Sequence, residues 1–464
     1  MALVLGNGYA IIREFPLFQL ITVALLGVYI VFFHADIAMY LLAFSTPFSI
    51  IFSSKDIQLG LSLPSEGLMI MLTVIFFARI LYDLHYNREL LKHPISIAIL
   101  VYLGWMFITC LTSVRPVVSL KFFASKIWFI TSCYWFFLQM LEDDMKNAVR
   151  YFNCYAVGLA IIVIITTYLH ALSGFDEHYA HYVMSPFYND HTAYGAALAF
   201  MLPFTVGFFF LPDNKLHQKI FYIVISLILA MGFYLSYSRA AWISLVLAVG
   251  VLIILKLRIK LSWLISGGLV VGVLLFFYAD DILYKMSRNS QDSSGNFVEH
   301  IQSMSNISTD ASNMERINRW TAAFKMIKEK PVFGWGPGTY QFEYAPFQVG
   351  YYRTIISTDF GDGGNAHSEY IGPCAETGIF GMLTVLAIVF VFLYYGITTY
   401  IYTEDKTLKI IVLCATLALI SYYSHGVFNN FLDTDKLSVI VWAAIAVITA
   451  SNIKNKNSET LQAS

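Results

Sequence analysis

Charged residues are scarce in this sequence of 464 residues: Lys, Arg, Asp and Glu make up 13%, against 58% hydrophobic residues. Soluble globular proteins carry about 25% charged residues. The shortage excludes an ordinary soluble enzyme, and repeated apolar runs of about 20 residues indicate a polytopic α-helical membrane protein. A transmembrane β-barrel would instead show alternating segments of about 10 residues. The formal net charge of −1 predicts no nucleic-acid partner.

Cysteine is also rare, and its placement excludes two further classes of protein. The five cysteines lie in or beside apolar runs and form no CxxC pair: Cys110, Cys133, Cys154, Cys374 and Cys414. We therefore expect buried thiols rather than a disulfide framework or a zinc site. The N-terminal apolar run lacks a clear small-residue cleavage site, so we expect it to be retained rather than removed as a signal peptide.

The apolar segments predict an all-α fold with twelve or thirteen transmembrane helices. They fall near residues 15–33, 37–52, 66–82, 94–112, 118–140, 151–170, 191–211, 219–237, 240–256, 261–278, 376–401, 407–424 and 436–452. The second is short and contains Pro47, which is why twelve is also possible. We expect three parts: N-terminal transmembrane helices (1–278), a partly helical loop domain (279–375), and C-terminal helices with a tail (376–464).

Lysine and arginine in the short loops predict the orientation. Basic residues recur in alternate loops, at Arg88 and Lys92, Lys146 and Arg150, Lys215 and Lys219, Lys256 to Lys260, Lys406 and Lys409, and Lys454 and Lys456. These loops then face the cytoplasm, and the polar segment 279–375 faces outward. The side on which the N-terminus lies stays open, because it depends on the second span.

The polar segment should contain one amphipathic helix. Residues 287–313 are rich in Ser and Asn, and we expect them to be mobile. Ser312 and Glu315 then form a capping-box pattern, and Pro331 ends the helix. Apolar residues recur at helical spacing in an expected membrane-facing stripe: Ile317, Trp320, Phe324 and Ile327.

Three arginines are candidates for binding an anionic substrate. Arg239 lies between two apolar spans at the outer boundary, where it is either a fixed cation or a side chain that extends to lipid headgroups. Arg316 and Arg319 lie on the predicted loop helix. The planar guanidinium suits phosphate oxygens in bidentate geometry; the alternative is a solvated helix face next to Glu315.

His367 is the candidate general base, because a histidine at a water–membrane edge can accept a proton near neutral pH; the alternative is a purely structural role. The outer ends of two other spans carry further polar residues, at Asn189, Asp190 and His191 and at Lys121 and Lys126. Helix capping and snorkelling are the structural alternatives for these. Asp359 and Asp362 could suggest a metal site, but no ligand spacing supports one, and we predict no cofactor.

Four stretches in order resemble the O-antigen ligase and O-antigen polymerase family of bacterial membrane glycosyltransferases. They are Ser238 to Trp242, Arg316 to Trp320, Lys330 to Tyr340, and Ala366 to Tyr370 followed by Ala375 to Gly381. Residues 185–191 also look like a family element, so the resemblance covers about residues 180–395. The family histidine is commonly followed by Asn, where this sequence has Ser368. The N-terminal spans carry no matching motif.

This resemblance implies a fold like that of GT-C glycosyltransferases in the bacterial inner membrane, with a periplasmic active site. The implied donor is a glycan linked to undecaprenyl diphosphate, and the implied acceptor is lipid A-core or a second lipid-linked glycan. The implied reaction is inverting and metal-independent. His367, Arg316 and Arg239 would be catalytic, and Arg319, Asn189, His191, Lys126 and Glu376 would bind substrate.

Other functions fit the sequence less well. Ligase and polymerase differ only in the acceptor, which the sequence does not decide, and transfer of glycan to a protein is a further variant. A flippase or transporter would usually show repeat symmetry and a site at the membrane midplane, whereas the ionisable residues here gather at one face. A peptidoglycan polymerase of the shape and division family shares the architecture but fits the motifs worse.

Overall fold

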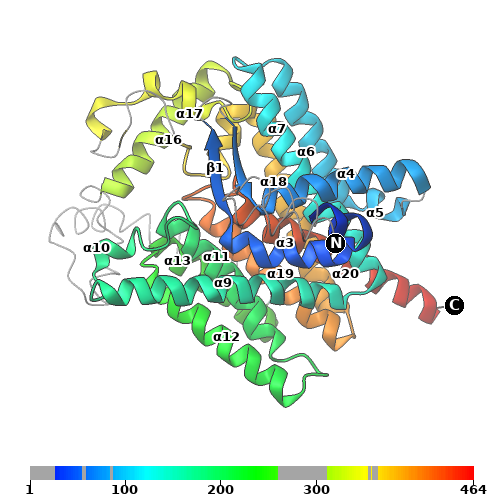
Figure 1. Ribbon diagram of the computed structural model, residues 1–464. Helices are drawn as coiled ribbons and strands as arrows, with labels where there is room; N and C mark the ends of the chain where they lie inside the picture. Colours follow the sequence, from blue (N-terminus) through cyan, green and yellow to red (C-terminus); the bar gives the residue numbers. More distant parts are fainter. Residues whose placement is uncertain are drawn as a thin grey trace, which may run out of the picture.

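The protein is a helical membrane protein (Figure 1). The computed structural model describes residues 27–54, 59–83, 87–259, 311–353, 357 and 364–463. Within these ranges, eight helices are long and apolar enough to cross a membrane: α4, α6, α9, α12, α13, α18, α19 and α20. The predicted multi-pass helical fold is thereby confirmed. The predicted span 261–278 and most of the span 15–33 lie outside the described residues.

The helices follow the predicted spans closely. Their bounds are α3 Ala35–Ser45, α4 Ser65–Asp83, α5 Arg88–Lys92, α6 Pro94–Leu111, α7 Pro116–Ile130, α8 Phe137–Asp143, α9 Lys146–Leu172, α10 Glu177–Ala180, α11 His191–Phe208, α12 Leu216–Leu235, α13 Arg239–Leu257, α16 Ala311–Glu329, α17 Tyr340–Glu343, α18 Ile371–Tyr402, α19 Lys406–His425 and α20 Asp435–Ala463. A π-helical segment, η2 Thr131–Phe136, joins α7 to α8. Three short 3-10 turns complete the set: η1 Thr46–Phe48, η3 Ala345–Phe347 and η4 Gly350–Tyr352.

The second predicted span is not one continuous helix. The α3 helix stops after 11 residues, at Ser45, and Pro47 lies in the 3-10 turn η1 that follows. The chain then forms strand β1 (Ile50–Ser54), which pairs antiparallel with β2 (Leu59–Leu63), Ile50 opposite Leu63. This small hairpin is an addition to the otherwise helical fold.

Helix α20 forms the centre of the bundle. In its most apolar window 94% of residues are buried inside the protein, against 67% for α19 and 17% for α13. A helix that is apolar on all sides is covered either by other helices or by lipid. The α20 helix is therefore surrounded by other helices, whereas α13 presents most of its surface to lipid.

The predicted loop helix is confirmed as α16, but the helix already includes Ser312, the predicted cap, and its predicted apolar stripe is only partly right. Phe324 is 57% exposed, whereas Ala322, Ala323 and Met326 are completely buried. Glu315 and Arg319 lie on the same buried face. The helix thus packs through Ala322, Ala323, Met326 and a buried ion pair, whereas Phe324 lies on the exposed face.

Helix ends that the charge pattern predicts on the outer side come together in the structure. One pocket is lined by residues of α6, α7, α18, α19 and α20 and of the segments around 338–341, 364–369 and 430–433. Segments far apart in sequence therefore meet at one end of the bundle, beside α16 and α17 (Figure 1). The α18 helix begins at Ile371, slightly before the predicted boundary at residue 376.

Candidate functional site

The third and fourth sequence motifs pack directly against each other. Helix α18 is broken at Gly378, which has φ +75°. The turn after α16 fits into this break: Ile379 N–H donates to the Pro331 carbonyl at 2.9 Å, and Gly336 N–H donates to the Glu376 carbonyl at 2.7 Å. A Cβ added at Gly378 would lie 1.9 Å from the Val332 oxygen. Glycine is required there both by the backbone conformation and by the close approach.

The short segment before α18 holds the predicted base. His367 adopts a left-handed backbone with φ +47°, which is uncommon for a residue other than glycine or asparagine. Its N–H donates to Asn365 Oδ1 at 3.0 Å, and its carbonyl accepts from Trp320 Nε1 at 3.4 Å. Two side chains therefore fix the backbone of His367 in an uncommon conformation, which is typical of functional sites.

The imidazole of His367 is neutral at physiological pH. Burial, followed by the positive charges of Arg316 and Arg319, lowers its pKa to about 4. Among the described residues, none makes a hydrogen bond to its ring. The next residue, Ser368, differs from the common family pattern but acts as a cap: its Oγ accepts from the N–H groups of Tyr370 and Ile371 at 3.3 Å each.

Arg316 and Trp320 share one face of α16, as their spacing predicts. The Arg316 Nε donates to the carbonyl of Phe428 at 3.2 Å, and the Trp320 ring stacks on Phe428 with centroids 6.3 Å apart. Arg316 is half-buried, and its charge acts on both His367 and His191. Arg316 is thus bound to the segment between α19 and α20, and its charge reaches both histidines.

Arg319 has a different environment from Arg316. It is 4% exposed, its Nε donates to Glu315 at 2.5 Å, and its guanidinium lies 4.2 Å above the Tyr344 ring. Gly364 packs so closely that an added Cβ would lie 1.3 Å from the Arg319 Nη1. Arg319 thus binds the buried carboxylate of Glu315 and the aromatic ring of Tyr344. These contacts favour a structural role over direct contact with phosphate.

Arg239 and His191 lie near each other because two helices approach closely. A Cβ at Gly195 of α11 would lie 2.7 Å from the Ser238 Cβ, so glycine allows α11 to contact the turn before α13. Arg239 is the first residue of α13, and its charge acts on His191, the first residue of α11. The His191 ring also stacks on His181, with centroids 4.2 Å apart and planes at 8°.

The two residues before α11, Asn189 and Asp190, have different environments. Asp190 is the N-cap, and its Oδ1 accepts from the N–H groups of Thr192 and Ala193 at 2.8 Å each. Its charge also acts on His367. Asn189 is exposed. The structural interpretation of Asp190 is thus confirmed, and the predicted role of Asn189 stays a prediction.

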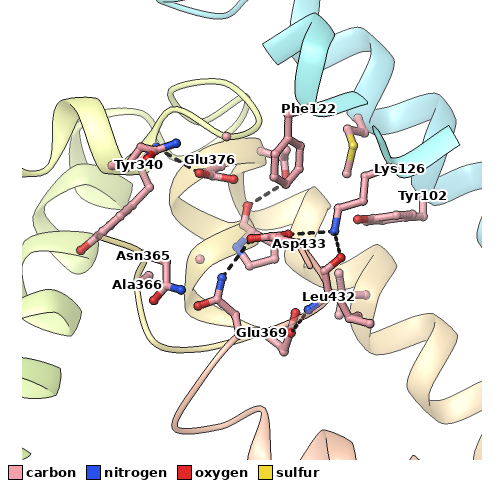
Figure 2. Close-up of a pocket in the computed structure, with 18 of the residues that line it drawn as sticks. Tyr102, Phe122, Lys126, Tyr340, Asn365, Ala366, Glu369, Glu376, Leu432 and Asp433 are labelled. Carbon is pink, nitrogen blue, oxygen red and sulfur yellow. Dashed lines mark hydrogen bonds and ion pairs between the residues drawn. The ribbon is translucent and has the colours of Figure 1, made fainter. Parts of the chain in front are cut away.

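Lys126 and Glu376 belong to a neighbouring pocket of about 350 Å³. Figure 2 shows Lys126 and Tyr102 entering from one side, with Tyr340, Asn365 and Ala366 on the opposite side. Glu376 Oε1 accepts from the Tyr340 N–H at 3.0 Å. Neither His367 nor Arg316 lines this pocket, although Asn365 and Ala366 do. The predicted residues thus form two groups that share the segment before α18.

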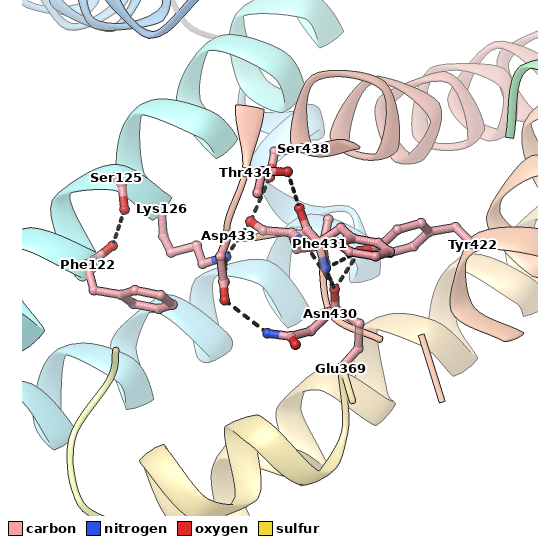
Figure 3. A network of polar contacts seen from close by, with 11 residues as sticks. Phe122, Ser125, Lys126, Glu369, Tyr422, Asn430, Phe431, Asp433, Thr434 and Ser438 are labelled. Atoms are coloured by element: carbon pink, nitrogen blue, oxygen red, sulfur yellow. Dashed lines mark hydrogen bonds and ion pairs between the residues drawn. The ribbon is translucent and has the colours of Figure 1, made fainter. Parts of the chain in front are cut away.

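The pocket is built around a polar network that sequence reasoning missed. Lys126 is 3% exposed; its Nζ donates to Asp433 Oδ1 at 2.8 Å and to the Leu432 carbonyl at 2.5 Å. Asn430 Nδ2 donates to the other oxygen of Asp433 at 3.1 Å. Figure 3 shows this chain of contacts from Lys126 through Asp433 to Asn430. Lys126 is therefore paired with a carboxylate, and its predicted phosphate contact stays a prediction.

Glu369 is the second missed residue, and it is 6% exposed. Its Oε1 accepts from the Tyr422 hydroxyl and from the N–H groups of Phe431 and Leu432, the latter two at 2.7 and 3.0 Å (Figure 3). Burial, followed by the nearby Asp433 carboxylate, raises the pKa of Glu369. Glu369 lies within the fourth motif, which could have indicated it, whereas its partners are distant in sequence.

The structure indicates no metal centre among the residues that it describes: no group of three or more His, Cys, Asp and Glu is placed to hold an ion there. Asp359 and Asp362, the weak metal candidates, lie outside the described residues. The five cysteines are free thiols, as expected from their apolar surroundings.

Comparison with known proteins extends these observations. Residues 224–386 match the family model described as O-antigen ligase. An uncharacterised protein from Haemophilus influenzae is 24% identical over 256 residues, which are 53% of this chain and 60% of that protein. The chain therefore spans less than two thirds of the length of this relative. The matched range contains Arg239, Arg316, Arg319, His367 and Glu376, so the similarity to the O-antigen ligase family includes these candidate site residues.

Proposed function

We propose that this protein is a glycosyltransferase that moves a glycan from undecaprenyl diphosphate to an acceptor hydroxyl at the periplasmic face of the bacterial inner membrane. One observation carries the proposal: Arg316 and Trp320 share a face of α16, Trp320 Nε1 donates to the His367 carbonyl, and the charge of Arg316 acts on both His367 and His191. A base and cations are thus gathered at one end of a membrane helix bundle.

The arginines suit the leaving group. When the bond between the anomeric carbon and the diphosphate oxygen breaks, the electron pair stays on the diphosphate. Negative charge then grows on that oxygen, and fixed cations stabilise it without reorganisation. Arg316 is anchored through its Nε to the Phe428 carbonyl. Arg239 stands at the outer end of a lipid-facing helix, where a prenyl chain could remain in the membrane.

His367 is suited to take the proton from the acceptor hydroxyl. As the acceptor oxygen bonds to the anomeric carbon, its proton passes to the imidazole, which later releases it to water. A pKa of about 4 keeps the imidazole neutral but makes it a weak base. A bound diphosphate would offset the charge of Arg316, and the pKa of His367 should then rise toward the range in which proton transfer is efficient.

We assign the acceptor first to lipid A-core, because the matching family model is described as O-antigen ligase. A second lipid-linked glycan, as in a polymerase, is the alternative. Purified protein should be given an undecaprenyl-diphosphate glycan with both acceptors in parallel. Transfer to lipid A-core supports a ligase, and extension of the lipid-linked glycan supports a polymerase. Failure of transfer to either acceptor, with donor intact, contradicts the proposed function.

A further inference from the structure

The pocket beside His367 has a chemistry opposite to that of the arginine group. Three carboxylates line it, on Glu369, Glu376 and Asp433, against a single cation among its lining residues, Lys126. That cation is already bound to Asp433. The balance leaves two carboxylates without a cation in the pocket lining. The lining therefore offers a diphosphate no cation that is not already paired, so the pocket is unsuited to the head of the lipid donor.

The free polar atoms of the pocket are mainly acceptors. Glu369 is more than nine-tenths buried and lines the cavity. Its Oε1 accepts three hydrogen bonds, and its Oε2 has no partner among the described residues. Asn430 Oδ1 is also buried without a partner. Buried acceptors without donors are costly unless a ligand supplies the donors.

Aromatic rings complete the wall. Tyr102, Phe122 and Tyr340 line the same cavity, whose volume of about 350 Å³ is near the lower end of the usual range for small-molecule sites. A sugar ring offers hydroxyl donors at its edge and apolar C–H groups on its faces. Carboxylate oxygens and aromatic rings therefore match both parts of a neutral saccharide.

We infer that this pocket binds a neutral, hydroxyl-rich sugar of the acceptor, while the arginine group binds the diphosphate of the donor. This inference rests on the proposed function. Asn365 connects the two places, because its side chain lines the pocket and its Oδ1 holds the His367 N–H. An acceptor sugar in the pocket would thus lie next to the segment that carries the base.

Two substitutions of different chemistry test the pocket. Glu376→Gln replaces a carboxyl oxygen with an amide group at nearly constant shape. Gly372→Ala adds a methyl group to the lining, where the new Cβ meets the Ala366 Cβ at an ordinary 3.6 Å. Alanine also favours a helix over glycine by about 1 kcal/mol, so a loss of binding in this variant at an unchanged melting temperature cannot come from unfolding.

Matched controls exist for both changes. Gly250→Ala adds a methyl group in α13, where an added Cβ meets nothing within 4 Å. Glu404→Gln removes an exposed charge from the connection between α18 and α19. Neither control residue lines the pocket.

Saturation-transfer difference NMR on the purified full-length protein in detergent measures the binding directly. The probes are methyl β-glucopyranoside, methyl β-galactopyranoside and N-acetylglucosamine, with inorganic diphosphate as competitor. We expect a saturable signal from at least one sugar, unchanged by diphosphate, lowered at least about fivefold by Glu376→Gln and by Gly372→Ala, and kept by both controls.

Three results would overturn the inference: no sugar signal, a signal equal in the pocket variants and the wild type, or displacement of the sugar by diphosphate. The measurement needs neither donor nor turnover. If glycan transfer fails but the sugar binds, the proposed function is contradicted and the sugar site in the pocket stands. If glycan transfer succeeds but no sugar binds, only the sugar site is contradicted.

Discussion

Asn365 holds the backbone of His367: the Asn365 Oδ1 accepts the His367 N–H at 3.0 Å, in a turn where His367 has φ +47°. The same asparagine lines the neighbouring pocket. One short segment therefore presents a base on one side and a pocket wall on the other. Replacement of this side chain should move the base without removing it.

We expect Asn365→Ala to lower kcat by about fivefold or more, because a typical hydrogen bond stabilises its geometry by about 1 kcal/mol. The KM for the donor should change little, since the arginines are untouched. Steady-state transfer kinetics with varied donor separate the two constants. A rise in donor KM at constant kcat would show that Asn365 serves binding rather than the position of His367.

The pH dependence should report the environment of His367. Burial and the two arginines lower its pKa to about 4, and a general base works only in its neutral form. Activity that depends on this group is thus present above the pKa and lost as pH falls through it. For kcat/KM, which reflects free enzyme, we expect the acidic limb near about pH 4 rather than about 6.5.

The limb for kcat should lie at higher pH, because bound diphosphate offsets the positive charge near the imidazole. Profiles of both constants from about pH 4 to 8 make the comparison. An acidic limb of kcat/KM at the ordinary histidine value would contradict the described environment of His367.

Arg319 should matter for stability more than for chemistry. It pairs with Glu315 at 2.5 Å, and both side chains are 5% exposed. Removal of one partner of a buried ion pair leaves an uncompensated charge and costs about 3–5 kcal/mol. We expect Arg319→Ala to lower the free energy of unfolding by that amount and Arg319→Ala with Glu315→Ala to lower it less. Equal destabilisation by the single and double variants would show that the ion pair between Arg319 and Glu315 does not stabilise the fold.

The loop helix shows how far sequence patterns reach. Hydropathy predicts the long spans and helical periodicity predicts α16, because both signals are local. The buried face of α16 was not predictable, since Phe324 is exposed while Ala322 and Ala323 are buried. Near a membrane an exposed apolar side chain is not penalised as it is in water, so periodicity alone does not identify the face that packs against protein.

The polar pocket could not be predicted from the sequence for a different reason. Glu369 bonds to Tyr422, and Lys126 bonds to Asp433, pairs that are separated by 53 and 307 residues. No local pattern marks such pairs. The arginines and His367 could be singled out because each lies within one of the four matching stretches, and the basic residues of the short loops predict one side of the membrane for all of them.

Gly378 should be intolerant of any side chain. It has φ +75°, and an added Cβ would lie 1.9 Å from the Val332 carbonyl oxygen. The backbone conformation alone costs about 1–3 kcal/mol for other residues, and the contact adds to it. We expect Gly378→Ala to lower the thermal unfolding midpoint in detergent, whereas Gly250→Ala, with open space around it, should not. Equal midpoints for the two variants would mean that the turn at 331–336 does not depend on the break in α18.

The most direct test of the proposed chemistry compares Arg316→Ala, Arg316→Lys and His367→Ala with the wild type in glycan transfer from undecaprenyl diphosphate, using folded, purified protein. We predict loss of transfer by at least about 100-fold in both alanine variants. Arg316→Lys should remain poor, because a point charge does not replace the bidentate guanidinium. Transfer at the wild-type rate by Arg316→Ala and His367→Ala would contradict the assignment of this site.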